Sequence, residues 1–136
     1  MKRNIFVNLP VKNLEATQTF FSALGFSYNA QFTNETAACM IIEDNIFAML
    51  ITEPYFQTFT PQPIADARVN TEVLIALSCE SRAEVESMVK NAVAAGGNTY
   101  NEAKDHGFMY QHGFQDLDGH IWEVMWMNPD YVLPQE

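Results

Sequence analysis

The sequence contains one pattern twice, and this repetition limits the folds that the chain can adopt. A strand-like alternation of apolar side chains near the beginning recurs near the middle, and a helix signal follows each. Aligning Phe6 with Leu74 also aligns the two helix starts, Asn13 and Ser81, so the register holds across both elements. Such self-similarity indicates an internal duplication. Each half is therefore predicted to form one β-α-β-β-β module.

The first module is predicted to span residues 4–52. Asn13 can cap a helix that ends at Gly25, because its apolar side chains recur at helical spacing and glycine is the usual residue after a helix. Alternating apolar residues between turn signals predict the strands of this module, at residues 5–11, 26–32, 36–42 and 46–51.

The second module is predicted to span residues 73–128. Ser81 and Glu84 form a capping-box pattern at the start of its helix, and Gly96 and Gly97 end that helix. Its strands are expected at residues 73–79, in a short segment from residue 98, at residues 107–114 and at residues 121–127.

A long connection, residues 53–72, joins the modules. It contains three prolines and three aromatic residues, Tyr55, Phe56 and Phe59. Connections longer than about 12 residues in a compact domain tend to cover sites or to form contacts. We expect the aromatic residues to cover a ligand or to contact a second copy of the chain, with ordinary packing as the alternative.

The predicted fold class is α+β, in a single domain over residues 1–136. Each amphipathic helix must cover one face of its own strands, so the other face is left bare. The two modules are expected to form a curved, mostly antiparallel mixed sheet around a cavity, with the helices on the outside. The bare face that lines this cavity is predicted to carry Phe6, Asn8, Leu74, Ala76, Ser78, Ile121, Glu123 and Met125.

The charge balance argues against nucleic acid as a partner. Seven Lys and Arg residues stand against 17 Asp and Glu, which gives a net charge of -10, and no basic run exists to follow a phosphate backbone. Residues 1–4 lead directly into a strand, and no apolar stretch approaches the roughly 18 residues of a membrane span. We expect a soluble, cytoplasmic protein, with Cys39 and Cys79 as core residues rather than a disulfide framework.

The closing strand carries an acid in an apolar setting. A turn containing Asp116, Asp118 and Gly119 precedes the strand, in which Glu123 follows Trp122 directly. An ionised carboxylate in such surroundings costs several kcal/mol unless it is compensated. Glu123 is therefore expected to meet a metal ion, to meet a hydrogen-bond donor, or to line a hydrated cavity.

Three segments resemble the vicinal oxygen chelate superfamily, which contains glyoxalase I, bleomycin-resistance proteins and extradiol dioxygenases. They are LPVKNLEATQTFFSALGF, IALSCESRAEVESMVKNAVAAGG and FQDLDGHIWEVMW, and together they cover nearly the whole chain. Within this group the chain is most similar to small bacterial proteins described as predicted lactoylglutathione lyases. The resemblance implies paired βαβββ modules, a homodimer and a site between modules.

The resemblance also implies four metal-ligand positions, one on each of four strands. They correspond to Phe6, to a residue at or beside Leu50, to Leu74 and to Glu123. Only Glu123 is a ligand type that these positions require, because phenylalanine and leucine cannot coordinate a metal ion. No cofactor is therefore assigned, although a divalent metal is left open.

The histidines offer one alternative site. His120 and Glu123 are three residues apart, which places them on opposite faces of a strand. Tyr110 and His112 share one parity and could point together toward the face that carries Glu123. Alternatively, His112 bonds a backbone carbonyl and His106 belongs to a surface turn.

Three functions are compatible with these residues. The first is a small-molecule-binding protein with a degenerate metal site, whose ligand contacts Phe6, Asn8, Phe56, Leu74, Ser78, Tyr110, His112 and Glu123. The second is a metal-dependent glyoxalase-like lyase or isomerase, in which Glu123 acts as catalytic base or metal ligand. The third is a structural homodimer with a vestigial cavity, in which Asn8 or Tyr110 hydrogen-bonds Glu123.

Overall fold

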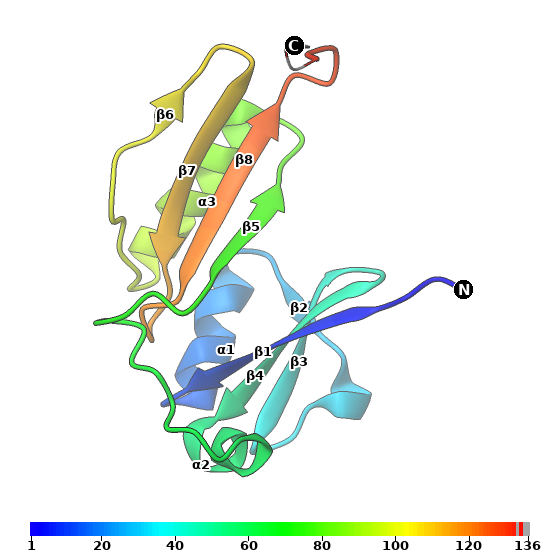
Figure 1. Ribbon diagram of the computed structural model, residues 1–136, viewed down its shortest axis with the longest axis vertical. Helices are drawn as coiled ribbons and strands as arrows, with labels where there is room; N and C mark the ends of the chain where they lie inside the picture. Colours follow the sequence, from blue (N-terminus) through cyan, green and yellow to red (C-terminus); the bar gives the residue numbers. More distant parts are fainter. Residues whose placement is uncertain (133, 135–136) are drawn as a thin grey trace. The chain divides into compact units, whose positions relative to one another are not determined.

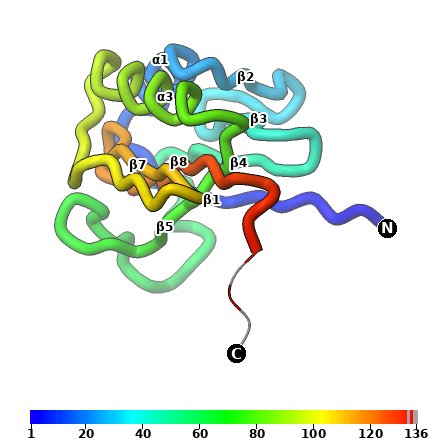
Figure 2. The backbone as a smooth tube through the Cα atoms, turned by 90° about the horizontal axis from the view of Figure 1, so that it is seen from above, coloured from blue at the N-terminus to red at the C-terminus, as the bar shows by residue number. Residues whose placement is uncertain are grey.

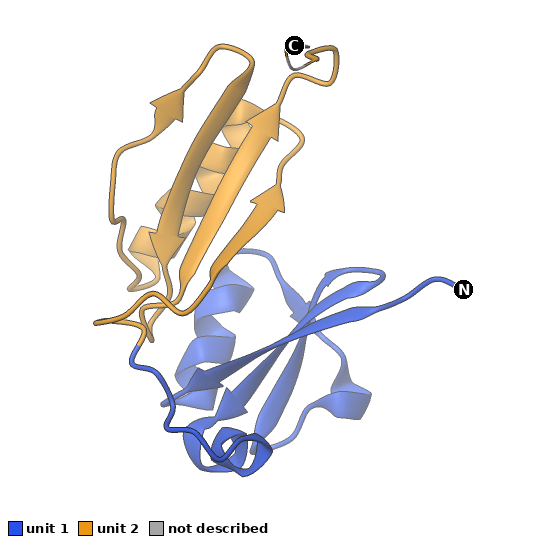
Figure 3. Cartoon of the chain, in the orientation of Figure 1, with its two compact units in different colours: residues 1–66 blue, residues 67–136 orange. Residues whose placement is uncertain are grey.

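The computed structural model describes residues 1–132 and 134, and the chain divides into two compact units. These units are Met1–Asp66 and Ala67–Glu136 (Figure 3). Each unit contains one four-stranded mixed sheet with a helix against one of its faces. The α+β class and the two-module organisation predicted from the sequence are confirmed.

The first unit builds its sheet in the order β1-β4-β3-β2 (Figure 1). β1 pairs with β4 in parallel, whereas β4 with β3 and β3 with β2 pair antiparallel. These strands are β1 (Ile5–Val11), β2 (Ser27–Tyr28), β3 (Ala37–Glu43) and β4 (Ile46–Thr52).

The helix of the first unit, α1 (Leu14–Ala23), begins where the sequence predicts. The Asn13 side chain accepts a hydrogen bond from the backbone N–H of Ala16 at 3.0 Å, which satisfies one of the free N–H groups of the first turn. Phe20 and Phe21, on the inner face of the helix, are fully buried. Gly25 follows the helix with φ of 99°, a left-handed conformation that glycine adopts without steric cost.

Two segments of the first unit differ from the sequence prediction. The strand expected over residues 26–32 is reduced to β2, because the Asn29 side chain caps a short 3-10 turn, Ala30–Phe32, instead. The predicted connection also begins with regular structure, since α2 (Glu53–Phe56) and a 3-10 turn, Gln57–Phe59, follow β4 directly.

The second unit repeats the same topology, with the order β5-β8-β7-β6. Its strands are β5 (Leu74–Ser78), β6 (Lys104–Asp105), β7 (Met109–Gln115) and β8 (Ile121–Met127). β5 pairs with β8 in parallel, and β8 with β7 and β7 with β6 pair antiparallel. The short strand expected from residue 98 is only a single bridge between Asn98 and Gln115, and β6 lies further along the chain.

The helix of the second unit, α3 (Arg82–Ala94), lies on one side of β7 and β8 (Figure 2). The Ser81 hydroxyl accepts from the N–H of Glu84 at 3.0 Å, as the capping pattern predicts. Val85 and Ala92 are fully buried, as are Trp122 and Val124 on β8. Val93, on the same helix, is 48% exposed.

The strand registers show which residues of the two units occupy equivalent positions. Phe6 pairs with Phe47 in the first sheet, and its counterpart Leu74 pairs with Ile121 in the second. Two residues further along, Met49 in β4 therefore occupies the place that Glu123 occupies in β8.

None of the helices in the described part of the chain has the length and apolar character of a membrane span.

Candidate functional site

Glu123 lies on the face of the second sheet that α3 does not cover. Trp122 and Val124 point toward the helix and are buried, so Glu123 between them points the other way and is half-buried. Its neighbours across the sheet are Ala76 on β5 and Gly113 on β7, and neither has a polar side chain. Among the described residues of this unit, none hydrogen-bonds the Glu123 carboxylate.

The open face around Glu123 is mostly apolar, as predicted. Leu74 and Ser78 lie on this face, since they pair with Ile121 and Met125 in the parallel register. Leu74 is 55% exposed. A carboxylate that no described residue of its unit hydrogen-bonds can receive a donor from a bound molecule.

Tyr100 approaches Glu123 because residue 113 is a glycine. A Cβ built at Gly113 would lie 2.2 Å from the Tyr100 hydroxyl oxygen, so only glycine leaves room for the phenol there. Burial raises the pKa of Tyr100, and the nearby Glu123 carboxylate raises it further. The phenol is therefore held protonated beside the acid, as a hydrogen-bond donor.

The segment that carries Tyr100 is attached to β7 at both ends. Asn98 and Gln115 exchange two backbone hydrogen bonds, of 3.1 and 2.7 Å. Lys104, at the other end, pairs with Gln111 in the β6-β7 ladder. This segment therefore forms a wall beside the open face next to Glu123.

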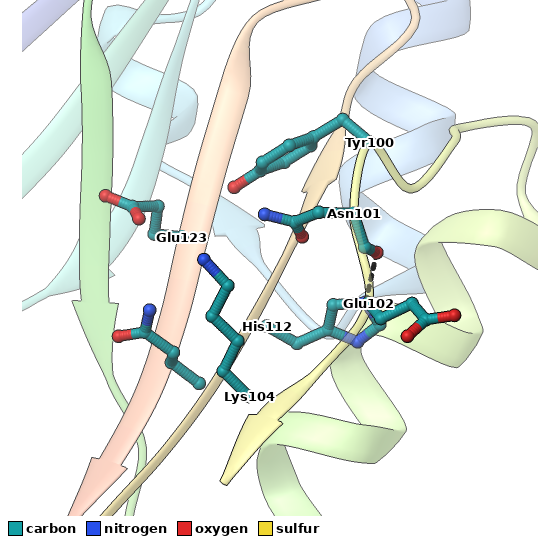
Figure 4. A pocket seen from close by; sticks show the side chains of 7 residues that line it. Tyr100, Asn101, Glu102, Lys104, His112 and Glu123 are labelled. Carbon is teal, nitrogen blue, oxygen red and sulfur yellow. Dashed lines mark hydrogen bonds between the residues drawn. The ribbon is translucent and has the colours of Figure 1, made fainter. Parts of the chain in front are cut away.

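A small pocket lies between this wall and the sheet (Figure 4). The Tyr100 hydroxyl, the Asn101 amide and the Lys104 ammonium point toward Glu123. The residues that line the pocket are Tyr100, Asn101, Glu102, Lys104, Gln111, His112 and Glu123. The arrangement combines two carboxylates, of Glu102 and Glu123, with several hydrogen-bond donors.

The expected orientation of Tyr110 and His112 is wrong. His112 pairs with Val124 and Tyr110 with Trp126, and paired residues of antiparallel strands share a face, so both side chains belong to the α3 side. The Tyr110 hydroxyl accordingly donates to Glu86 on α3 at 3.1 Å. His112 lines the pocket, but its Nε2 bonds the carbonyl of Asn101 at 3.1 Å, which confirms the alternative interpretation.

The predicted ligand contacts of the first unit lie on its own open face or next to its sheet. Phe6 is 49% exposed and stacks on Phe47 with 5.0 Å between ring centroids. Asn8 is exposed on the same face of β1. Phe56 is half-buried at the end of α2, near the edge-to-face pair of Tyr55 and Phe59.

The residues at the four family positions do not fit a metal ion. Leu50 is fully buried on the helix side of β4, so the position beside it that faces the open side is Met49. The four family positions therefore carry Phe6, Met49, Leu74 and Glu123. Two hydrocarbon side chains, one thioether and one carboxylate do not form a Zn²⁺ or Ni²⁺ site.

A second acidic group lies in the turn before β8. Asp116 is buried, and its Oδ1 accepts backbone N–H groups of Asp118 and His120, both at 3.0 Å. Its Oδ2 accepts from the indole Nε1 of Trp122 at 3.1 Å. The pKa of Asp116 is raised, because the effect of burial outweighs the lowering by His120 and these donors. The carboxylate thus organises the turn.

His120 is buried beside this turn and ion-pairs with Glu72. Its Nδ1 lies 2.8 Å from the Glu72 carboxylate. Asp116, Asp118 and His120 can bring one ligand atom each within 4.8 Å of one another, a spacing that a metal ion could bridge. The oxygens of Asp116 also accept three protein hydrogen bonds, so Asp116 itself has a structural role in the turn.

The cysteines are poor nucleophiles. Burial raises the pKa of Cys39, and burial together with Glu84 raises the pKa of Cys79 to about 12. Both thiols are therefore protonated near neutrality, as expected for core residues.

Sequence reasoning missed the wall of the pocket. Tyr100, Asn101 and Lys104 occur in a segment with no periodicity, and the pairing of β6 with β7 is what brings them to Glu123. The one available signal was Gly113, because an isolated glycine within a strand often marks a close approach of other groups.

The chain was compared with models of protein families and with curated proteins. The family model of the Glyoxalase/Bleomycin resistance protein/Dioxygenase superfamily matches residues 5–124. A search of curated proteins gave no match.

Several solved structures are similar over nearly their whole length. Hypothetical protein SA1046 from S. aureus is 29% identical with a TM-score of 0.78, covering 93% of this chain and 95% of that one. A glyoxalase-related enzyme from Fulvimarina pelagi is 20% identical with a TM-score of 0.79, covering 98% and 94%. The fosfomycin resistance protein FosX from Listeria monocytogenes is 17% identical with a TM-score of 0.68, covering 100% and 96%. The paired modules and the match over residues 5–124 lead to one conclusion: the chain belongs to the Glyoxalase/Bleomycin resistance protein/Dioxygenase superfamily.

Proposed function

We propose that this protein binds a small molecule on the open face of the second sheet, at Glu123, without a metal ion. The observation that carries this proposal is the state of the Glu123 carboxylate. It is half-buried on an apolar face, and no described residue of its unit hydrogen-bonds it. Since an isolated acid in such a place is costly, a ligand that supplies a donor there gains a strong, charge-assisted hydrogen bond.

The family positions support binding rather than metal-dependent chemistry. A glyoxalase I mechanism uses a metal ion to polarise the substrate while a glutamate moves a proton. Here Phe6, Met49 and Leu74 stand at the companion positions, and they supply no charged or nitrogen ligand. Glu123 is therefore proposed to contact the ligand directly.

The interpretation as a vestigial cavity receives less support. That hypothesis requires Glu123 to be a satisfied core acid, with Tyr110 as one of its two expected donors. The Tyr110 hydroxyl instead donates to Glu86, and the pocket beside Glu123 is lined by polar groups.

Thermal-shift screening followed by calorimetry tests the proposal. A panel of cationic, polar and aromatic compounds is screened against the wild type, and each hit is titrated into Glu123→Gln. This change keeps the shape of the side chain and removes its charge. We expect the affinity of true ligands to fall about tenfold or more, which corresponds to about 1.4 kcal/mol.

Glu35→Gln is the matched control, because Glu35 is exposed in the first unit and does not line the pocket. It should leave the affinity unchanged. Hits that bind both variants as well as the wild type would contradict the role of Glu123. Turnover of the methylglyoxal hemithioacetal with added Zn²⁺ or Ni²⁺, abolished in Glu123→Gln, would favour the lyase hypothesis instead.

A further inference from the structure

The side chains around Glu123 carry both signs of charge, which narrows the chemistry of the ligand. Lys104 contributes an ammonium group and Glu123 a carboxylate to the same pocket. Glu102 also lines the pocket, but its carboxylate points away from Glu123 (Figure 4). Neither charged group forms an ion pair or hydrogen bond with a described residue of the second unit. An acid and a base that share a pocket without pairing leave both charges available to a bound molecule.

The strand register explains why these two charges do not neutralise each other. Lys104 pairs with Gln111, and Gln111 pairs with Met125, so Lys104 shares the open face with Glu123. The two backbone positions are separated by two strand spacings, about 10 Å, and by two residues along β8, about 7 Å. Figure 4 shows the long Lys104 side chain extending toward Glu123 across this gap.

Uncharged donors fill the space between the two charges. The Tyr100 hydroxyl and the amides of Asn101 and Gln111 line the pocket, and none of these three side-chain groups hydrogen-bonds another described residue of the unit. Each can bind an oxygen atom of a ligand. Together with the ammonium group of Lys104, these donors therefore form a subsite for an anionic group.

On the basis of the proposed function, we infer that the ligand is a small amphoteric molecule. Its amino group binds the Glu123 carboxylate, and its anionic group, a carboxylate, phosphate or phosphonate, binds Lys104 and the neighbouring donors. The apolar open face, with Leu74, Ile121 and Met125, holds the part of the molecule between or beside the two charges. A molecule that carries only one of these groups makes half of the contacts.

Two matched sets of probes test this inference. One set is γ-aminobutyrate, butylamine and butyrate, and the other is para-(aminomethyl)benzoate, benzylamine and benzoate. Binding is followed by two-dimensional amide NMR of the full chain, which detects weak complexes. We expect at least one zwitterion to bind about tenfold more tightly than either of its one-charge relatives, with shifts at Glu123 and Lys104.

Two substitutions test the contribution of each charge to binding separately. Glu123→Gln should reduce binding of the zwitterion to the level of the acid, and Lys104→Met should reduce it to the level of the amine. Lys90→Met, on the exposed side of α3, is the control and should change nothing.

The outcomes distinguish this inference from the proposed function. If the amines bind as tightly as the zwitterions and only Glu123→Gln weakens them, the proposed function stands and the amphoteric ligand is refuted. If the acids bind as tightly and only Lys104→Met matters, both the ligand class and the central role of Glu123 are wrong. Equal affinities of all variants for every probe would overturn both proposals.

Discussion

Gly113 is the residue on which the pocket beside Glu123 depends most directly. It lies opposite Glu123 in the β7-β8 register, and its missing side chain leaves the space that the Tyr100 phenol occupies. A glycine in the interior of a strand costs stability, because it loses more conformational freedom than other residues. Its presence in β7 is explained by the close approach of Tyr100.

Gly113→Ala tests this relation. The new Cβ would lie 2.2 Å from the Tyr100 oxygen, so the phenol must leave, and we expect a loss of about 1–3 kcal/mol in the free energy of unfolding. Urea denaturation of the single and double mutants with Tyr100→Ala measures the coupling. The double mutant should recover part of the loss. Purely additive losses would mean that the two residues do not interact.

Asp116 shows how a buried acid can serve the fold instead of a ligand. Its two oxygens accept three N–H groups, from Asp118, His120 and Trp122. Asp116→Asn replaces one of these oxygens by an amide NH2 group. In either orientation of the amide, this group faces an N–H donor and a hydrogen bond is lost. We expect a loss of about 1–3 kcal/mol in stability, measured by thermal or chemical unfolding.

Asp130→Asn serves as the control for Asp116, since Asp130 is exposed. Its stability should stay within about 0.5 kcal/mol of the wild type. If Asp116→Asn unfolds at the wild-type denaturant concentration, the three hydrogen bonds are not a source of stability.

At the level of elements, the sequence predicts best where a local signal and a packing requirement agree. The two long helices begin directly after the caps Asn13 and Ser81 as expected, because each cap precedes a stripe of apolar side chains. β2 is shorter than predicted, since the Asn29 side chain stabilises a turn that competes with the strand. β6 could not be predicted, because a two-residue strand gives no periodic signal.

The link between β2 and α1 predicts a pH dependence of stability. The Tyr28 hydroxyl donates to the Gln18 carbonyl at 3.0 Å, and burial raises the pKa of Tyr28 to about 12. The ordinary value is 10.0, so between these values the folded chain holds a proton that the unfolded chain has lost. The contribution of Tyr28 to stability is therefore complete below pH 10.0 and declines as the pH rises toward 12.

Tyr28→Phe should lower stability by about 1 kcal/mol at neutral pH and reduce its decline above pH 10.0. Chemical unfolding at a series of pH values measures both effects. Tyr55→Phe, at an exposed position, should follow the wild-type curve. Identical slopes for the wild type and Tyr28→Phe would contradict the assignment.

For the whole molecule, the sequence predicted the arrangement of the strands better than the composition of the site. The duplication determined the topology of both units, and Glu123 was correctly placed opposite the helix. Tyr110 and His112 were misassigned, because parity within one strand does not fix its register with the next. The donors on the wall depend on contacts distant in sequence, which no local pattern encodes.

The residues at the family's metal positions lead to a prediction for the protein as a whole. We expect neither EDTA nor one equivalent of Zn²⁺ or Ni²⁺ to change the melting temperature by more than about 2 °C, because the family positions other than Glu123 carry Phe6, Met49 and Leu74, which supply no charged or nitrogen ligand. Differential scanning calorimetry measures the shift. Asp118→Asn identifies any stabilisation that arises from the cluster in the turn.

The attachment of residues 98–104 to β7 at both ends has an evolutionary consequence. The bridge at Asn98 and the pairing of Lys104 use backbone atoms, so the residues between them can change without disturbing the sheet. On the proposed function, substitutions at Asn101 and Glu102 would change the recognised molecule, whereas Tyr100 also packs against Gly113 and contributes to stability. Relatives that share the fold but differ between residues 98 and 104 are predicted to differ in the molecule that they bind rather than in their fold.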